Sequence, residues 1–214
     1  YATYAWSTEE TTSTIEVTTP GYYWVEVTDE NGCTILSETS QLGVSTLIPE
    51  TPSICMVGVE NGHNLVIWEE MSDNANVQNY RIYRENDQAN VYELLATIPA
   101  TQPNVYEDIT ADPSVRAYRY KVTAMDVCQG ETPMSELHKS VHLTINRGIG
   151  NTWNLIWSHY EGVEFSSYRL YRGTTNNNME LIATLPSTLT SYTDFENLDG
   201  ALFYQIEVVM NGSC

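Results

Sequence analysis

Four cysteines and four histidines are the residues of this chain best suited to chemistry, and neither set has the spacing of a metal site. No Cys-x-x-Cys pair occurs, although structural zinc sites usually draw their thiolates from such pairs. His138 and His142 would share one side of a helix, but along a strand they lie about 13 Å apart. We therefore expect no metal site and ordinary surface histidines. The cysteines are Cys33, Cys55, Cys128 and Cys214.

Motifs of hydrolases and nucleotide-binding proteins are absent from the sequence. It contains no His-Glu-x-x-His, Gly-x-Ser-x-Gly or Gly-x-x-x-x-Gly-Lys. Paired carboxylates for glycoside hydrolysis could be chosen at will from 28 acidic residues, so no single pair is informative. We predict that the chain is not an enzyme and uses no cofactor.

The charge of the chain restricts its partners. With 28 acidic and 9 basic residues, the formal net charge is −19. Such a polyanion is repelled by phosphate backbones and by anionic lipid, so we expect neither nucleic acid nor a membrane as a direct partner. The acids are scattered, which is typical of the surface of an exported protein, and no apolar run approaches 18 residues. We expect a secreted or cell-surface location.

The elements that carry these residues repeat with a period close to 90 residues. The offset between matching segments is 89 residues at Trp68 and Trp157 and 87 residues at Glu93 and Glu180. This period is too long for a solenoid repeat and fits a small sandwich domain. The matching segments are 64–68, 80–84 and 93–99 in the first copy and 154–157, 168–172 and 180–186 in the second.

Apolar and polar residues alternate with period two along these segments. In Tyr118–Ala124 the apolar residues occupy every second position, and Leu202–Val208 has the same pattern in the second copy. No window shows a convincing helical period. The sequence therefore predicts an all-β chain.

The order of the strands resembles that of fibronectin type III domains over about residues 49–214. The resemblance rests on a Leu/Val-x-Trp strand, a Tyr-x-Ile-Tyr strand and a Tyr-x-Tyr-x-Val-x-Ala strand. It implies strand B for Trp68, strand C for Tyr80 and Ile82, and the tyrosine corner of strand F for Tyr118. Leu202 occupies the corresponding position in the second copy and has no hydroxyl, so the hydrogen bond of the tyrosine corner must be absent there.

Residues 1–47 do not fit the repeat. Strands expected over 4–7, 13–17 and 22–27, followed by Val-Thr-Asp-x-x-Gly-Cys, resemble the C-terminal half of an Ig-like or PKD-like domain. Such domains are strung along secreted and surface proteins of the Bacteroidetes that are cargo of type IX secretion.

The resemblance implies an array of Ig-like and fibronectin type III β-sandwiches in a longer polypeptide. Its expected divisions are a partial domain over 1–47, a fibronectin type III domain over 48–138, and another over 139–214 that lacks its last strand.

The same resemblance implies one disulfide. In a fibronectin type III sandwich, the start of strand A and the loop after strand F share one pole, which would bring Cys55 near Cys128. Cys33 and Cys214 have no obvious mate in the chain, and we expect them not to be bonded to each other.

Two groups of residues are candidates for an interaction surface. Arg81, Arg119 and Lys121 would share the outer face of one sheet, either as a patch for an acidic partner or as partners of acids on adjoining strands.

Trp153 and Tyr160, with Phe165, have no match in the first copy. They could form an exposed platform that stacks on sugar rings, or they could pack against a neighbouring module, which we favour. The connection over 138–140 carries neither Gly nor Pro, so we expect the two repeats to move as one body.

These observations predict a non-catalytic spacer or adhesion module whose partners are other domains of the same polypeptide, with protein or glycan ligands as further partners. An accessory region of a secreted protease or glycosidase, and a carbohydrate-binding module, remain as alternatives.

Overall fold

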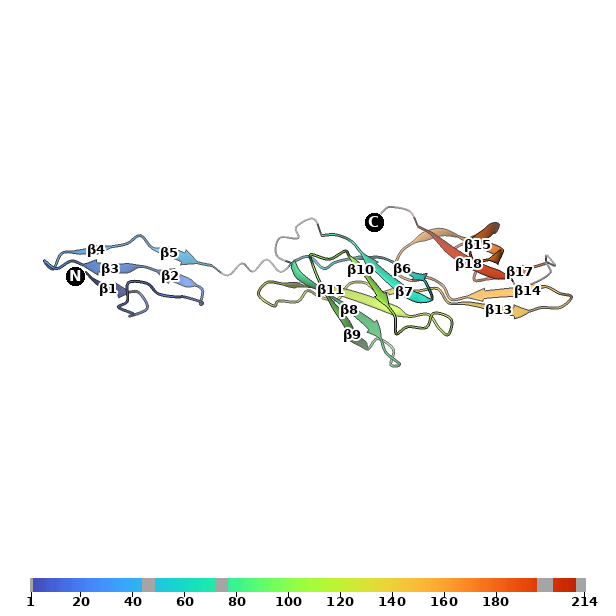
Figure 1. The fold of residues 1–214 in the computed structure, drawn as a ribbon, viewed down its shortest axis with the longest axis horizontal. Coiled ribbons are helices and arrows are strands. Elements are labelled where there is room, and N and C mark those ends of the chain that lie inside the picture. Colours follow the sequence, from blue (N-terminus) through green and yellow to red (C-terminus); the bar gives the residue numbers. More distant parts are fainter. Residues whose placement is uncertain (1, 44–48, 72–76, 196–201, 211–214) are drawn as a thin grey trace. The chain divides into compact units, whose positions relative to one another are not determined.

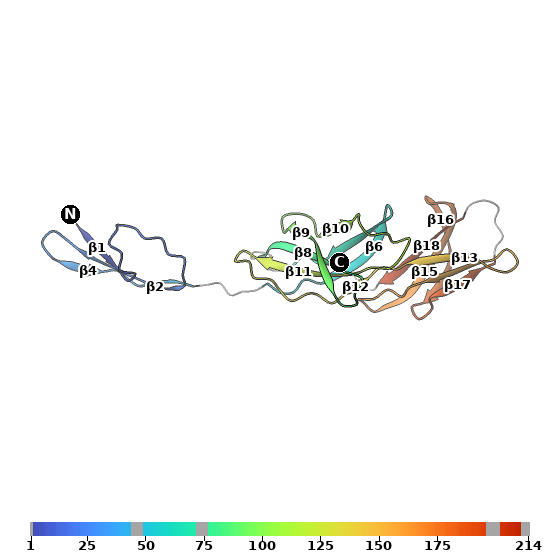
Figure 2. The same cartoon turned by 90° about the horizontal axis from the view of Figure 1, so that it is seen from below.

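The computed structural model describes residues 2–43, 49–71, 77–195 and 202–210 (Figures 1 and 2). Its regular structure is entirely β-strand, which confirms the all-β prediction. In these ranges no helix is present that could cross a membrane. The chain divides into two compact units, Tyr1–Leu47 and Ile48–Cys214, and the second unit contains both repeats.

The first unit forms two small sheets without a covered core. The sequence predicted one strand over 22–27, but the strand is interrupted at Trp24, because the residues before and after it pair in different sheets. No strand forms over 13–17, where no described neighbour pairs with the chain. None of the unit's described residues is buried, and Ile35 is 72% exposed. The sheets are β1 (Thr3–Trp6), β3 (Val25–Thr28) and β4 (Thr34–Leu36), and β2 (Gly21–Tyr23) with β5 (Ser40–Leu42).

The first repeat is a sandwich of a three-stranded and a four-stranded sheet. The order β10-β7-β6 against β12-β11-β8-β9 is that of a fibronectin type III domain, with strands E-B-A on one side and G-F-C-C′ on the other. All neighbouring strands are antiparallel. The strands are β6 (Ile54–Glu60), β7 (His63–Trp68), β8 (Val77–Glu85), β9 (Tyr92–Pro99), β10 (Val105–Asp108), β11 (Arg119–Asp126) and β12 (His138–Lys139).

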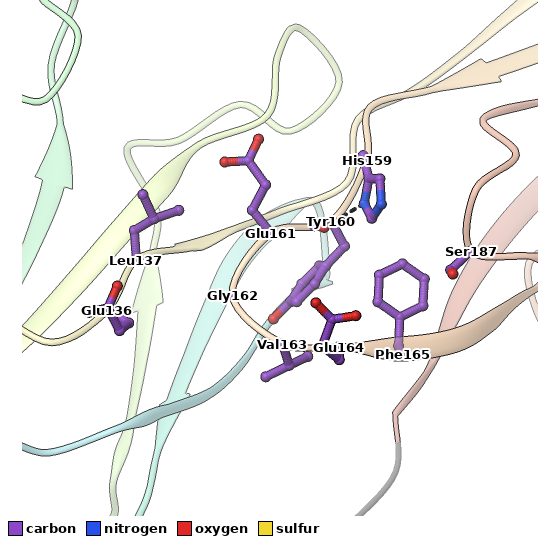
Figure 3. Close-up of a pocket in the computed structure, with 10 residues that line it drawn as sticks. All are labelled: Glu136, Leu137, His159, Tyr160, Glu161, Gly162, Val163, Glu164, Phe165 and Ser187. Carbon is purple, nitrogen blue, oxygen red and sulfur yellow. Dashed lines mark hydrogen bonds between the residues drawn. The ribbon is translucent and has the colours of Figure 1, made fainter.

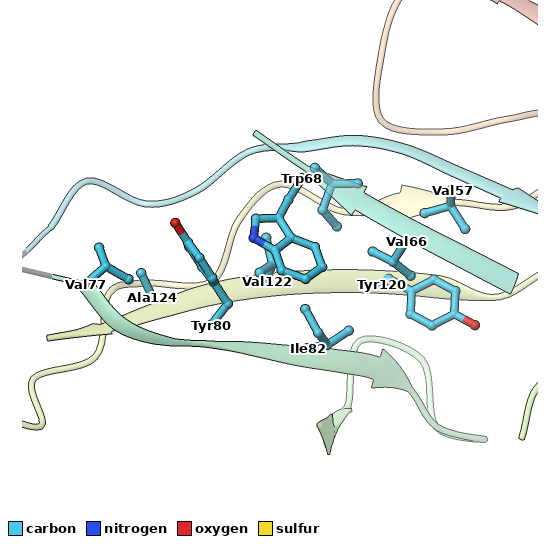
Figure 4. Packing of buried hydrophobic residues seen from close by; sticks show 10 residues of the cluster. Val57, Val66, Trp68, Val77, Tyr80, Ile82, Tyr120, Val122 and Ala124 are labelled. Atoms are coloured by element: carbon cyan, nitrogen blue, oxygen red, sulfur yellow. The ribbon is translucent and has the colours of Figure 1, made fainter. Parts of the chain in front are cut away.

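Trp68 and the inward residues of β8 and β11 form the core of this sandwich (Figure 4). Trp68 is 1% exposed, and its ring centroid lies 5.4 Å from that of Tyr80. Tyr120, Val122 and Ala124 are fully buried, which confirms their predicted parity. Burying side chains of this size contributes about 1.5–3 kcal/mol each, so the core dominates the stability of the repeat.

Tyr118 forms the predicted corner. Its hydroxyl accepts the backbone N–H of Asp112, six residues upstream, at 3.1 Å. Leu202, at the corresponding position of the second repeat, has no hydroxyl that could make this bond.

The second repeat has the sheets β13-β14-β17 and β16-β15-β18, which match those of the first repeat except that no strand among the described residues corresponds to β12. Its core contains Leu155, Trp157 and Tyr168, and the inward residues of β18 pack against them as predicted. The strands are β13 (Leu143–Arg147), β14 (Trp153–Trp157), β15 (Phe165–Thr175), β16 (Asn178–Pro186), β17 (Ser191–Asp194) and β18 (Phe203–Met210).

Candidate functional site

Arg81, Arg119 and Lys121 form a cationic stripe on one sheet face, as predicted, but each of them already has a partner within the chain. Arg81, Arg119 and Lys121 lie half-buried on the outer face of the four-stranded sheet. Nη1 of Arg81 is 2.6 Å from a carboxylate oxygen of Glu131, and Nζ of Lys121 lies 5.2 Å from the ring centroid of Tyr92. The stripe therefore fits the expectation of pairing with acids better than that of a free patch for an acidic partner.

Arg119 lies at the end of this stripe and joins the two repeats. It contacts Glu85 of its own repeat at 3.0 Å and Glu161 of the second repeat at 3.2 Å. Lys139 also reaches Glu161, at 2.5 Å, and its backbone N–H donates to the Glu161 carbonyl at 2.9 Å. Burial opposes ionisation of Glu161, but hydrogen bonds from Arg119 and Lys139 outweigh it and lower the pKa of the carboxyl.

Tyr160 makes the second contact between the repeats. It lies in the loop between β14 and β15, is 2% exposed, and accepts the backbone N–H of Val57 on β6 at 2.9 Å. Phe165 beside it is 8% exposed. An exposed aromatic platform that includes Tyr160 and Phe165 is therefore wrong, and Tyr160 packs against the neighbouring repeat as favoured. Burial raises the pKa of Tyr160 to about 12, so its hydroxyl keeps its proton at neutral pH.

The expectation of surface histidines is wrong for His138. This residue, on β12, is 3% exposed, and its Nδ1 lies 2.9 Å from the hydroxyl of Tyr160. Burial lowers the pKa of its imidazole to about 4. The sequence offered no sign of this burial, because the group that covers His138 comes from a loop 22 residues away.

Trp153 is the only one of the three unmatched aromatics that is not buried, within the residues the structure describes. It is of intermediate exposure, and the guanidinium carbon of Arg147 lies 5.6 Å from its ring centroid. The ring of Trp153 therefore packs against Arg147 on one side and remains partly exposed to solvent.

The predicted disulfide between Cys55 and Cys128 is wrong. Cys55 is disulfide-bonded, whereas Cys128 and Cys33 are exposed free thiols. The expectation that Cys33 is not bonded to Cys214 stays a prediction. Cys214 itself lies outside the described residues.

Both cysteines of that pairing lie at local irregularities of the backbone. The register of β6 against β7 shifts between Ile54 and Met56, so Cys55 sits at an irregularity that redirects a side chain. Cys128 lies in a tight turn in which the Asp126 carboxylate accepts its N–H at 2.8 Å. Neither feature is visible in the alternation of the sequence.

Each repeat also contains a buried Arg–Asp–Tyr cluster that sequence reasoning missed. In the second repeat, Nη1 of Arg172 lies 2.9 and 3.0 Å from the two oxygens of Asp194, to which Tyr204 donates at 2.9 Å. In the first repeat, Asp108 accepts from Arg84 at 2.6 Å and from Tyr120 at 2.8 Å. The clusters join the two sheets of each sandwich. The signal was available, since Tyr-x-x-Tyr-Arg occurs in both repeats.

An open groove of about 480 Å³ lies where the repeats meet (Figure 3). Glu136 of the first repeat and Glu164 of the second both line it, and the carboxylate of Glu164 lies beside the ring of Phe165. Ser187 and His159 also line the groove, but no hydrogen bond joins these two side chains as it would a nucleophile and its base. Within the described ranges, no group of three or more His, Cys, Asp or Glu is arranged to hold a metal ion.

Comparison with known proteins gives no family. No protein-family model matches the chain, and no curated protein matches it. It is similar to an Fn3-like protein from Clostridium thermocellum, with 19% identity and a TM-score of 0.36 over 43% of this chain and 91% of that chain.

Two further solved structures show comparable likeness. The FN1–FN3 domains of chicken CNTN1 match with 16% identity and a TM-score of 0.39, over 87% of this chain and 70% of that chain. A beta-1,2-glucanase from Parabacteroides distasonis matches with 17% identity and a TM-score of 0.37, over 64% and 24%. At these scores the likenesses carry no argument about function. The fibronectin type III fold of the two repeats is read from their own strand order.

Proposed function

We propose that the chain is a non-catalytic part of an exported multidomain protein, and that its second unit is a stiff spacer or adhesion stalk. One observation carries the proposal: the loop between β14 and β15 is fastened to the first repeat by Tyr160 and Glu161. The bonds run to Val57, His138 and Lys139. Two repeats held in this way keep a fixed orientation to each other. The unit can therefore set the distance between the domains at its two ends, and its partners are these neighbouring domains of the same polypeptide.

Export is supported by the cysteine chemistry and the charge. Cys55 is disulfide-bonded, and disulfides persist mainly in oxidising compartments outside the cytosol. The net charge of −19 opposes binding to nucleic acid and to anionic membranes. A setting among Bacteroidetes surface proteins with type IX secretion belongs to the proposal through the sequence resemblance of residues 1–47.

Small-angle X-ray scattering of the full chain at neutral pH tests the stiffness. We expect residues 48–214 to fit as one body. For the double variant Tyr160→Ala, Glu161→Ala, we expect that only two independently moving repeats fit the scattering curve. The curve of Arg147→Ala, whose contact lies within the second repeat, should still fit one body. A wild-type curve that only independently moving repeats can fit contradicts the proposal.

The two alternative functions have separate tests. An accessory role beside a catalytic domain uses the same stiff unit, and the full reading frame decides it: a neighbouring catalytic domain favours the accessory role, and many further sandwiches favour the stalk. A carbohydrate-binding role retains only Trp153 of its three aromatics as a partly exposed ring. Binding on a glycan array that is lost in Trp153→Ala would support it.

A further inference from the structure

The hydroxyl of Tyr160 connects a donor and an acceptor of the first repeat. Its oxygen accepts the N–H of Val57, and that N–H can only donate. We assign the phenol proton to the bond with Nδ1 of His138, 2.9 Å away, because this nitrogen is the side-chain acceptor that the described structure offers it; the assignment places the imidazole proton on Nε2. This chain of two hydrogen bonds requires a neutral imidazole.

A proton added to His138 would disrupt the arrangement in two ways. Nδ1 would become a donor that faces the phenol, and the phenol proton would lose its acceptor, because Tyr160 has no other side-chain acceptor within the described structure. The added charge would also be buried in a side chain that is only 3% exposed.

The charged groups around His138 offer no direct compensation. Arg119 of β11 and Lys139 of β12 are cations, and the carboxylate of Glu161 in the loop is engaged by both. Burial alone, without a charge partner, lowers the pKa of the imidazole. The other titratable groups on the elements packed here are Tyr120, Lys121 and Asp126 of β11, Glu60 of β6, Glu136 before β12, and His159, Tyr160 and Glu164 of the loop. Of these, Tyr120 pairs across the strands with His138.

We propose that the junction between the two repeats is a pH-sensitive joint, closed while His138 is neutral and released when it is protonated. The inference rests on the proposed stiff unit and adds its regulation. Release frees the β14–β15 loop from β6 and β12 and turns the stiff spacer into two linked sandwiches. An ordinary pKa near 6.5 in the open form and about 4 in the closed form favour opening roughly 70-fold more at pH 4.5 than at pH 7.5.

Amide hydrogen exchange at Val57 measures this opening even when the open form is rare. The protection factor, the intrinsic exchange rate divided by the observed rate, removes the chemical effect of pH. We expect the Val57 factor to fall roughly 70-fold from pH 7.5 to pH 4.5 in the full chain. The amides of Thr132 and Trp157, which donate to carbonyls within one repeat, should not follow it.

Two variants assign the effect to one residue. In His138→Gln, whose amide oxygen can accept from Tyr160 at every pH, we expect Val57 protection to stay constant. His142→Gln changes a nearby histidine that contacts the Pro113 carbonyl, and it should behave like the wild type. An unchanged Val57 factor in the wild type, or an equal fall in His138→Gln, overturns the joint.

Two further outcomes are decisive. If His138→Gln opens the junction already at pH 7.5, the imidazole titration of the wild type by NMR decides: a value near 4 supports the joint, and an ordinary value near 6.5 overturns it. If the wild-type Val57 amide has no protection at pH 7.5, the proposed function as a stiff spacer is contradicted. If Val57 is protected at pH 7.5 and equally protected at pH 4.5, only the proposed regulation by pH is contradicted.

Discussion

The backbone of Gly162 lies directly against the imidazole ring of His138. Gly162 has a φ of 126°, a conformation that L side chains rarely adopt, and a Cβ there would overlap the ring. The loop that carries Tyr160 and Glu161 can approach the first repeat this closely because residue 162 has no side chain. Glycine at this position is thus a condition for the contact between the repeats.

We expect Gly162→Ala to separate the repeats. The backbone strain and the overlap with His138 together should lower the free energy of unfolding by about 2–4 kcal/mol, measured by urea denaturation. Val57 should lose its hydrogen-exchange protection at neutral pH. Gly150→Ala is the matched control: its φ is 68° and nothing lies near the added methyl, so we expect a loss of only about 1 kcal/mol. Equal losses in the two variants would contradict the role assigned to Gly162.

The two Arg–Asp clusters should respond unequally to loss of the carboxylate. The side chain of Arg172 is 2% exposed and its Nη2 also lies 2.6 Å from Glu180, so Asp194→Ala leaves a buried cation with one of its two carboxylates and should cost about 3 kcal/mol, the low end for a broken buried pair. The side chain of Arg84 is 22% exposed and can turn towards water, so Asp108→Ala should cost about 1–3 kcal/mol. Urea denaturation of both variants measures the difference. A larger loss for Asp108→Ala would show that burial of the remaining cation does not decide the cost.

The sandwich class could be predicted from the sequence, because it depends on local alternation and on large core residues such as Trp68 and Tyr120. The junction could not. His138 and Tyr160 are buried by contacts between segments that no periodicity relates, and the register shift of β6 at Cys55 leaves no sign in the alternation. Parity predicts the correct face for the stripe, yet Glu131, the partner of Arg81, follows β11 at an isolated bridge to Met125 that alternation does not describe.

Alkylation of the native protein checks the cysteine states. We expect Cys33 and Cys128 to react rapidly without reductant, because both are exposed free thiols. Cys55 should react only after reduction, and peptide mapping should find it in a cross-linked peptide that contains neither Cys33 nor Cys128. Recovery of a Cys55–Cys128 peptide would restore the pairing that the sequence resemblance implied.

The stability of the whole chain should fall in acid over a window set by His138. Its pKa is near 6.5 in the unfolded chain and about 4 in the folded chain, so the unfolded state binds more protons between these values. The contribution of His138 to the free energy of unfolding therefore rises with pH from about 4 to 6.5 and is constant above pH 6.5. We expect a difference on the order of 2–3 kcal/mol between pH 4.5 and pH 7 in urea denaturation.

Carboxylates act in a different window. Burial opposes ionisation of Asp108, but hydrogen bonds from Thr110, Tyr120 and Arg84 outweigh it and lower its pKa. Its contribution is therefore present above the ordinary value near 3.9 and is lost only as the pH falls below it. His138→Gln should flatten the stability profile between pH 4.5 and 6.5 and leave the steeper loss at lower pH in place. If the variant keeps the wild-type slope above pH 4.5, the slope belongs to groups other than His138.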